Sequence, residues 1–194
     1  MHKLEYVAAV FGVASVYLGA RQNIWSWPTT IVNVALYAFV FHSSRLYAAM
    51  GLQVMFIIIS IYGWYQWLYG GRNRTELKVS RTPRRLAVIL ALIGGSFALL
   101  LGTLLYRTTN AALPFLDSAL SSASLVAQWM LTRKLLENWL VWIAVDVVYV
   151  GMFLASSLTV TAGLYFVFLV LCVMGYRQWK ASLTEPELAT AEAA

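Results

Sequence analysis

Charged residues cut this sequence into long, nearly uncharged segments, and this segmentation constrains the fold more than any other feature. A helix that crosses the hydrocarbon core of a bilayer needs roughly 20 mostly apolar residues. Five segments approach or reach this length, and they are the ranges 6–20, 22–44, 46–71, 86–106 and 114–132. A further segment, 138–176, is too long for one span and is divided by the polar patch at 156–161. The sequence therefore predicts an all-α integral membrane protein with seven transmembrane helices.

The composition excludes several other classes of protein. Of the 194 residues, 11% are charged and 61% are hydrophobic, with a mean hydropathy of +0.71, whereas a soluble domain is about 25% charged. A chain of this size has too little interior to hide so much apolar surface from water. The single cysteine, Cys172, excludes an intramolecular disulfide, and two histidines without a Cys/His cluster predict neither a metal nor a cofactor. Without a visible nucleophile–base pair, we expect a protein that is not an enzyme.

The basic residues predict the orientation in the membrane, because cytoplasmic loops carry an excess of lysine and arginine. With seven spans, eleven basic residues fall on the side of the C-terminus and three on the side of the N-terminus. The larger group is Arg21, Arg72, Arg74, Lys78, Arg81, Arg84, Arg85, Arg133, Lys134, Arg177 and Lys180, and the smaller group is Lys3, Arg45 and Arg107. We expect the N-terminus outside the cell and the C-terminus in the cytoplasm. The basic run 72–85 is interpreted as a topology signal that anionic membrane lipid attracts, and not as a nucleic-acid site. The first residues predict no cleavable signal peptide.

The sequence contains an internal repeat. When the range 21–67 is laid without gaps on the range 133–179, rare residue types coincide, and we call this pairing the repeat alignment. Shared hydrophobicity alone rarely aligns tryptophan, glycine and glutamine. The clearest matches are Trp27 with Trp139, Tyr37 with Tyr149, Phe56 with Phe168, Gly63 with Gly175, and Gln66-Trp67 with Gln178-Trp179. The first three predicted helices therefore resemble the last three.

This repeat predicts two three-helix units joined by a linker helix. Three helices and one linker restore the starting direction, so the two units run parallel, in the 3+1+3 order of SWEET-like transporters, with a substrate site near the midplane between them. A duplicated scaffold without a path through it is the alternative. The ranges are 1–70 for the first unit, 71–85 for a basic cytoplasmic loop, 86–106 for the linker transmembrane helix, 114–179 for the second unit and 180–194 for a cytoplasmic tail.

Polar and aromatic residues recur at helical spacings of three and four inside the predicted spans. Such side chains are costly in hydrocarbon, so they face a partner helix or a wet cavity. The candidate substrate-binding residues are Asn33, Tyr37, Gln53, Trp64, Gln128, Asn138, Trp139, Trp142, Asp146 and Tyr149. Flat aromatics and neutral polar groups, without an internal lysine or arginine, suit a neutral or singly cationic ring compound. A phosphorylated ligand would require basic residues or a glycine-rich loop.

Structural interpretations of the same residues stay open at this point. Tryptophan and tyrosine near helix ends form belts at the membrane interface. The belt candidates are Trp25, Trp27, Trp67, Tyr69, Trp139 and Trp179. The amides of Asn33, Gln53 and Gln128 are candidates for hydrogen bonds between helices. Asp146, the acid deep inside a span, either pairs with a tyrosine or an asparagine or takes part in ligand or proton binding.

Several motifs together resemble one transporter family. Gln128, Arg133-Lys134 and Glu137-Asn138-Trp139, followed by Trp142 and Asp146, resemble the A-Q-x-L…R-K-x-x-E-N-W-x-x-W-x-x-x-D signature of bacterial nicotinamide riboside transporters, the PnuC family. Further matches are Tyr62-Gly63-Trp64-Tyr65-Gln66-Trp67, the L-Y-A…L-Q pattern of Leu46–Gln53, and Trp27-Pro28 with Asn33 and Tyr37. The matches run from Trp25 to Trp179. One departure is Ala49, which stands where the family has an acid.

The resemblance implies a fold, an activity and partners. It implies seven helices in the 3+1+3 arrangement, a homotrimer, and a site in the bacterial inner membrane. It also implies facilitated import of unphosphorylated nicotinamide riboside, which a cytoplasmic kinase then traps. Related members carry thiamine or riboflavin, so the resemblance leaves these vitamins as alternative substrates. Proton coupling through Asp146 is a further alternative to passive transport.

Overall fold

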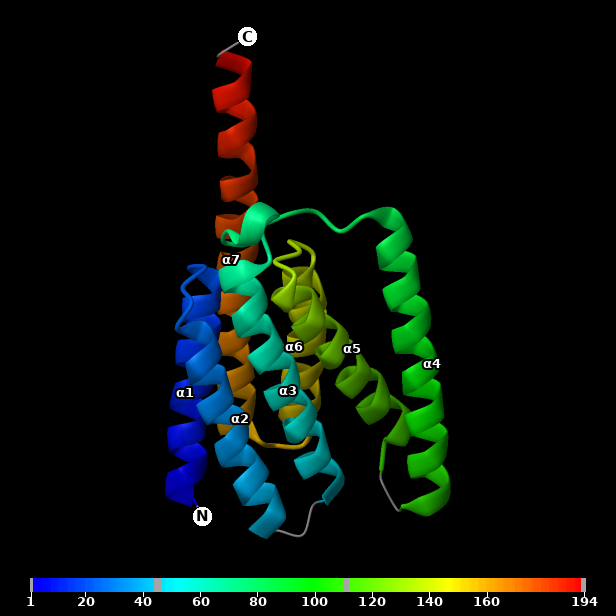
Figure 1. Ribbon diagram of the computed structural model, residues 1–194. Coiled ribbons are helices and arrows are strands. Elements are labelled where there is room, and N and C mark those ends of the chain that lie inside the picture. The colour runs from blue at the N-terminus through cyan, green and yellow to red at the C-terminus, as the bar shows by residue number, and fades with distance from the viewer. Residues whose placement is uncertain (1, 44–46, 110–111, 193–194) are drawn as a thin grey trace.

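Seven α-helices form the part of the chain that the computed structural model describes, which is residues 2–43, 47–109 and 112–192 (Figure 1). They are α1 His2–Ala20, α2 Ser26–Ser43, α3 Tyr47–Tyr69, α4 Arg84–Thr108, α5 Pro114–Thr132, α6 Asn138–Ala155 and α7 Thr159–Glu192. A short 3-10 helix, η1 Arg72–Arg74, follows α3. The predicted helix count is confirmed for these residues. The helix α7 continues into the range that the sequence assigned to a tail, and the predicted positions at 44–46 lie outside the described residues.

Four of the helices are long and apolar enough to cross a membrane. These stretches are Ala49–Tyr69, Arg84–Thr108, Asn138–Ala155 and Thr159–Thr184, and Leu4–Ala20 is a shorter apolar helix. The helices α2 and α5 are not among the helices that are both long and apolar enough to cross a membrane. Their sequences contain the threonines, serines and amides of the predicted polar stripes, and such residues belong on faces turned away from lipid.

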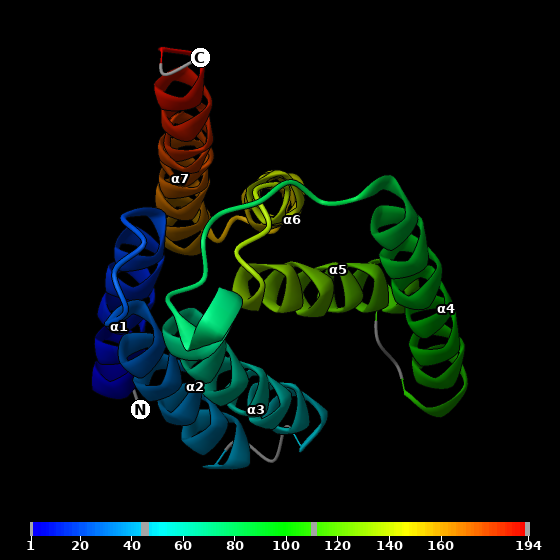
Figure 2. The same ribbon diagram turned by 45° about the horizontal axis from the view of Figure 1, so that its top comes forward.

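Six helices form a closed ring, and one lies outside it. Each ring helix packs on the next in the order α1, α2, α3, α5, α6, α7, and α7 returns to α1 (Figure 2). The helix α4 packs on α5 and stands apart from the ring. The ring therefore brings the first three helices and the last three around one shared interior.

One end of the ring holds the turns that contain most of the basic residues. We call it the basic end and define it by residues 21–25, 70–83 and 133–137 and by the part of α7 around 177–180 (Figure 1). The N-terminus of α1 lies at the opposite end, which we call the far end. Of the basic residues expected on the other side of the membrane, Arg45 lies outside the described residues. The described turns that contain the larger basic group lie together at the basic end.

The connection between α3 and α4 is docked on the turn between α5 and α6. The Ser80 amide donates to the Lys134 carbonyl (3.0 Å), and the Leu136 amide donates to the Ser80 carbonyl (2.8 Å). The Glu137 carboxylate accepts hydrogen bonds from the Thr82 amide (2.7 Å) and from the Thr82 hydroxyl (2.6 Å). This basic loop is therefore an ordered strap, and its four hydrogen bonds fix where the chain crosses towards α4.

Lys134 links this turn to the core. It is buried, and its ammonium nitrogen lies 4.5 Å from the centre of the Trp67 ring, within the range of a cation–π contact. Burial lowers the pKa of Lys134 below its ordinary value, and the negative charge of Glu76 acts in the opposite direction. The basic end is thus held together by a buried cation on an aromatic face as well as by backbone bonds.

Four tryptophans pack together at the basic end. The side chains of Trp27, Trp67, Trp139 and Trp179 are 0–2% exposed and belong to one core cluster. The edge of one ring meets the face of another in two pairs, Trp27–Trp67 (5.3 Å between centroids, 87°) and Trp139–Trp179 (5.4 Å, 89°). A belt residue needs contact with lipid, so the belt interpretation is wrong for these four. It fits Trp25 and Tyr69, which are exposed.

Two glycines make this tryptophan cluster possible. A Cβ atom on Gly63 would overlap the Trp27 ring, and one on Gly175 would overlap the Trp139 ring. The indole N–H of Trp67 donates to the Leu131 carbonyl (3.0 Å), and that of Trp179 donates to the Gly19 carbonyl (3.1 Å). Both hydrogen bonds join one half of the ring to the other. The cluster therefore fastens the two halves at this end.

Candidate functional site

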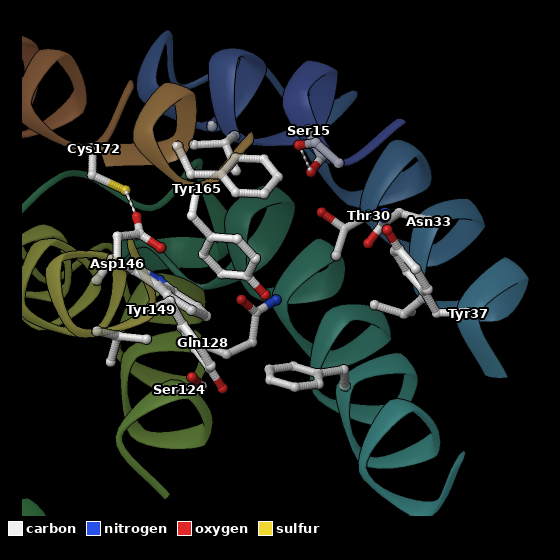
Figure 3. A pocket seen from close by; sticks show the side chains of 18 of the residues that line it. Ser15, Thr30, Asn33, Tyr37, Ser124, Gln128, Asp146, Tyr149, Tyr165 and Cys172 are labelled. Carbon is white, nitrogen blue, oxygen red and sulfur yellow. Dashed lines mark hydrogen bonds between the residues drawn. The ribbon is translucent and has the colours of Figure 1, made fainter. Parts of the chain in front are cut away.

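A cavity of about 460 Å³ lies inside the ring, and all six ring helices contribute to its wall (Figure 3). Trp27 and Trp139, two members of the tryptophan cluster, line it towards the basic end. Phe41, Phe153 and Thr161 line it near the other ends of their helices. The cavity thus extends from the tryptophan cluster towards the far end, with its long dimension along the helices.

Eight of the ten residues predicted to bind substrate line this cavity. They are Asn33, Tyr37, Gln53, Gln128, Trp139, Trp142, Asp146 and Tyr149. The helical spacings that selected them therefore identified faces that converge on one space.

The other two predicted residues lie elsewhere. Trp64 is 38% exposed, because α3 lines the cavity only around Leu52–Phe56 and Trp64 lies at least two turns further towards the basic end. Asn138 is the first residue of α6 and is fully buried, with its side-chain amide donating to the Leu135 carbonyl (2.6 Å). It holds the turn before α6 and does not reach the cavity.

The prediction missed residues on α1 and α7. Tyr165, Phe168 and Cys172 of α7 line the cavity, as do Gly12 and Ser15 of α1. These two helices contain no polar stripe that marks an inward face. The repeat offers a signal for α7, because the repeat alignment pairs Tyr165 and Phe168 with the cavity residues Gln53 and Phe56.

The amides on the cavity wall also connect helices. The side-chain nitrogen of Asn33 donates to the Ala8 carbonyl of α1 (2.6 Å), and that of Gln128 donates to the Ser60 hydroxyl of α3 (3.2 Å). A side chain at Gly12 would crowd the Asn33 amide, with a Cβ only 3.0 Å from its nitrogen. Asn33 and Gln128 therefore have both roles, because each side-chain amide bonds a neighbouring helix and also lines the cavity.

Aromatic rings cover the wall formed by α6 and α7. Tyr165 lies at the centre of this group, 4.8 Å from Tyr149, 5.1 Å from Phe153 and 5.7 Å from Phe168 between ring centroids. Tyr149 and Phe153 are also stacked on each other (5.8 Å, 13°). Such a wall offers ring faces and edges to a flat heterocycle.

The cavity has little formal charge. Among the described residues that line it there is no lysine, arginine or histidine, and Asp146 is the one carboxylic acid. Asp146 is 4% exposed, and one of its oxygens accepts a hydrogen bond from the Cys172 thiol (3.5 Å). The described residues contain no group of three metal-ligating side chains. The described wall of the cavity therefore consists of aromatic, apolar and neutral polar side chains together with one acid.

Comparison with known proteins gives consistent matches along almost the whole chain. A family model described as "Nicotinamide mononucleotide transporter" matches residues 2–181. The nicotinamide riboside transporter PnuC of Escherichia coli (strain K12) is 28% identical, over 94% of this chain and 87% of that protein. The riboflavin/roseoflavin transporter RibM of Streptomyces davaonensis is 27% identical, over 90% of this chain and 83% of that protein.

A solved structure has the same fold. A crystal structure of the vitamin B3 transporter PnuC superimposes with a TM-score of 0.74 at 23% identity, over 94% of this chain and 82% of that one. The two chains therefore share one fold.

Proposed function

The chain belongs to the nicotinamide mononucleotide transporter family, and from this premise we propose that it carries unphosphorylated nicotinamide riboside across the membrane. The curated relatives with the riboside in their names match it over most of both chains. The substrate would occupy the cavity inside the ring.

The observation that carries this proposal is the cavity wall itself. A phosphate group is bound in proteins mainly by arginine and lysine side chains or at a helix N-terminus. The described lining of the cavity contains no arginine and no lysine. A riboside needs an aromatic face for its ring and neutral donors and acceptors for its hydroxyls and carboxamide. The wall supplies both, so the riboside fits better than the mononucleotide in the description of the family model.

Within the cavity we assign binding to the eight predicted residues that line it. Trp142 and Tyr149 would stack on the ring, and the amides of Asn33, Gln53 and Gln128 would bond the ribose and the carboxamide. The side-chain nitrogens of Asn33 and Gln128 each donate one hydrogen bond to another helix. The second N–H and the carbonyl oxygen of each amide would then bond the substrate.

We further propose the 3+1+3 arrangement of two parallel units with α4 as linker. Several contacts recur at positions that the repeat alignment pairs, which supports it. The Trp27–Trp67 and Trp139–Trp179 pairs have nearly the same geometry. The same alignment, continued towards the N-terminus, pairs Gly19 with Leu131, the acceptors of the two indole bonds. The turns before α2 and α6 match too, with positive φ at Gln22 and Lys134.

Orientation, coupling and assembly complete the proposal. The excess of basic residues supports a cytoplasmic basic end, with the N-terminus outside. Transport would be downhill, with a cytoplasmic nucleoside kinase trapping the product, and the unit would be a homotrimer in the inner membrane.

The variant Thr75→Cys tests the orientation, because a cysteine in the loop between α3 and α4 should resist impermeant thiol reagents in intact cells. Ready labelling would invert the topology.

A second candidate substrate is riboflavin, and one observation favours it. RibM is almost as similar to this chain as PnuC is, and its name gives riboflavin as cargo. An isoalloxazine ring would also stack on the aromatic wall of α6 and α7. The two vitamins differ in size and charge, so a direct comparison separates them.

The test is uptake into proteoliposomes that contain the purified protein. Labelled nicotinamide riboside, its mononucleotide, riboflavin and thiamine are offered side by side, and empty liposomes give the background. We expect rapid, saturable uptake of the riboside and little uptake of the other three. Uptake of riboflavin in preference to the riboside would overturn the substrate, and uptake of none of the four would overturn the function.

A further inference from the structure

Asp146 occupies an unusual place in this cavity. It projects from the middle of α6, and its carboxyl group is directed into the cavity towards Tyr165 (Figure 3). The Cys172 thiol, a weak donor, bonds one of its oxygens. The residue is almost completely buried. A carboxyl group in this position is placed for contact with whatever fills the cavity.

The protein supplies no positive charge to this carboxylate within the cavity. None of the described lining residues is a lysine, arginine or histidine. The buried cation Lys134 lies in the turn before α6, does not line the cavity, and contacts the Trp67 ring instead. A buried carboxylate without a positively charged partner is costly, and in proteins such a group is paired with a cation or neutralised by a proton. The missing partner therefore has to come from the ligand or from a proton.

Aromatic side chains flank the carboxyl group along the same helix. Trp142 lies one turn before Asp146 and Tyr149 one turn after it, and all three line the cavity. Ring faces attract cations, most strongly where water is excluded. A carboxylate framed by aromatic faces is a binding arrangement for a flat cation, in which the ring stacks while its charge is neutralised.

We propose that Asp146 is the counter-ion for a positively charged ring and sets the preference of the site for cationic ligands over neutral ligands of the same shape. The inference rests on the proposed function and deepens it. Nicotinamide riboside has a pyridinium ring with one positive charge, whereas its 1,4-dihydro form has nearly the same shape and no charge. The oxidised riboside should therefore bind much more tightly than the reduced riboside.

The experiment measures binding of these two ribosides to the purified protein in detergent, at a mildly alkaline pH where the reduced form is stable. The wild-type protein should prefer the oxidised riboside by about 30-fold, the lower end of what removal of one partner of a buried charge pair costs. Asp146→Asn keeps the shape and should reduce this preference to less than about threefold by weakening only the cation. Asp146→Glu keeps the charge and should retain part of the preference.

The matched control is Asp117→Asn on α5, which removes an exposed acid. It should leave both affinities unchanged. Each variant is first compared with the wild type by size-exclusion profile and thermal unfolding. If Asp146→Asn does not fold, the affinities of the wild-type protein for the oxidised and the reduced riboside still test the inference. Equal affinity for the two ribosides overturns it.

The remaining outcomes separate the inference from the proposed function. Equal binding of both ribosides overturns the counter-ion role and leaves the riboside as substrate. Preference for the cation that survives in Asp146→Asn also overturns the role, since the charge preference then comes from the aromatic faces alone. Binding of neither riboside overturns the proposed function together with the inference.

Discussion

The two halves of the ring, α1–α3 and α5–α7, which we proposed above to be repeat units, are alike at the basic end and differ at several positions around the cavity. At the basic end, each unit has two tryptophans that meet edge to face, a glycine against one indole, and an indole N–H that bonds the other unit. Around the cavity some corresponding residues are identical, such as Tyr37 and Tyr149, and others differ in chemistry. Thr30 and Val34 of α2 stand where α6 has Trp142 and Asp146, and Gln53 of α3 stands where α7 has Tyr165.

We propose from this difference that the two halves of the ring have different roles in binding the substrate. Contacts that hold the helices together recur in both units because they depend on local shape. The α6–α7 wall has more aromatic rings and the one acid of the described lining, so it is suited to hold the heterocycle. At the positions that differ, the first unit has Thr30, Val34 and Gln53, and these smaller, neutral groups suit the sugar. The following substitutions test this comparison.

The largest effect is expected from filling the space beneath the two tryptophans. Gly63→Ala and Gly175→Ala each place a methyl group against an indole ring, and overpacking of this kind costs about 1–3 kcal/mol. The two variants should lose similar stability, measured by unfolding in detergent. The matched controls are Gly51→Ala and Gly163→Ala, which the repeat alignment also pairs and where an added Cβ has nothing within 4 Å. A large loss of stability at only one of these two glycines would show that the two units are not packed alike at the basic end.

Substrate affinity should depend on α6 far more than on α2. Trp142→Ala removes a ring face from the cavity and should weaken riboside binding by about 2 kcal/mol, judged from base–aromatic stacking. Thr30→Ala changes the corresponding position of the first unit and should weaken binding by less than about 0.5 kcal/mol, as expected where no ring face is lost. Isothermal titration of both folded variants gives the comparison. Equal losses would show that the two units share the ring contact.

The indole hydrogen bonds between the units should contribute less. Trp67→Phe and Trp179→Phe each remove one N–H bond as well as ring volume. Trp27→Phe and Trp139→Phe remove ring volume alone, since neither indole nitrogen has a hydrogen-bond partner among the described residues. The first pair should be less stable than the second by about 1 kcal/mol per variant. If all four variants lost the same stability, the cross-unit bonds would have no measurable weight.

An imposed pH gradient should have no effect on the final level of substrate. The described cavity wall has one acid and no basic partner for a proton relay. In proteoliposomes without kinase, and with the membrane potential clamped, we expect the riboside to equilibrate at equal concentrations inside and outside, for the wild type and for Asp146→Asn alike. Accumulation that follows the pH gradient in the wild type and disappears in Asp146→Asn would establish proton coupling.

The sequence predicted the helices and eight of the residues that line the cavity, and physical reasons explain both these predictions and the failures. Charges end hydrophobic helices, and helical spacing places residues such as Asn33 and Asp146 on inward faces. The burial of a tryptophan could not be predicted in the same way, because Trp179 in the core and Trp25 at the surface both lie near helix ends predicted from the sequence. The inward face of α7 could not be predicted from the sequence, because Tyr165 lies among apolar residues and no polar stripe marks that face. The strap depends on pairing between Ser80 and the distant α5–α6 turn.

The most direct test of the asymmetric site is a structure of the protein with nicotinamide riboside bound. The pyridinium ring should lie against Trp142 and Tyr149 of α6, with its charge beside Asp146, and the ribose should lie towards the amides of Asn33 and Gln53. A ring held against α2, or a ligand bound outside the cavity of the six-helix ring, would contradict this assignment of roles to the two units.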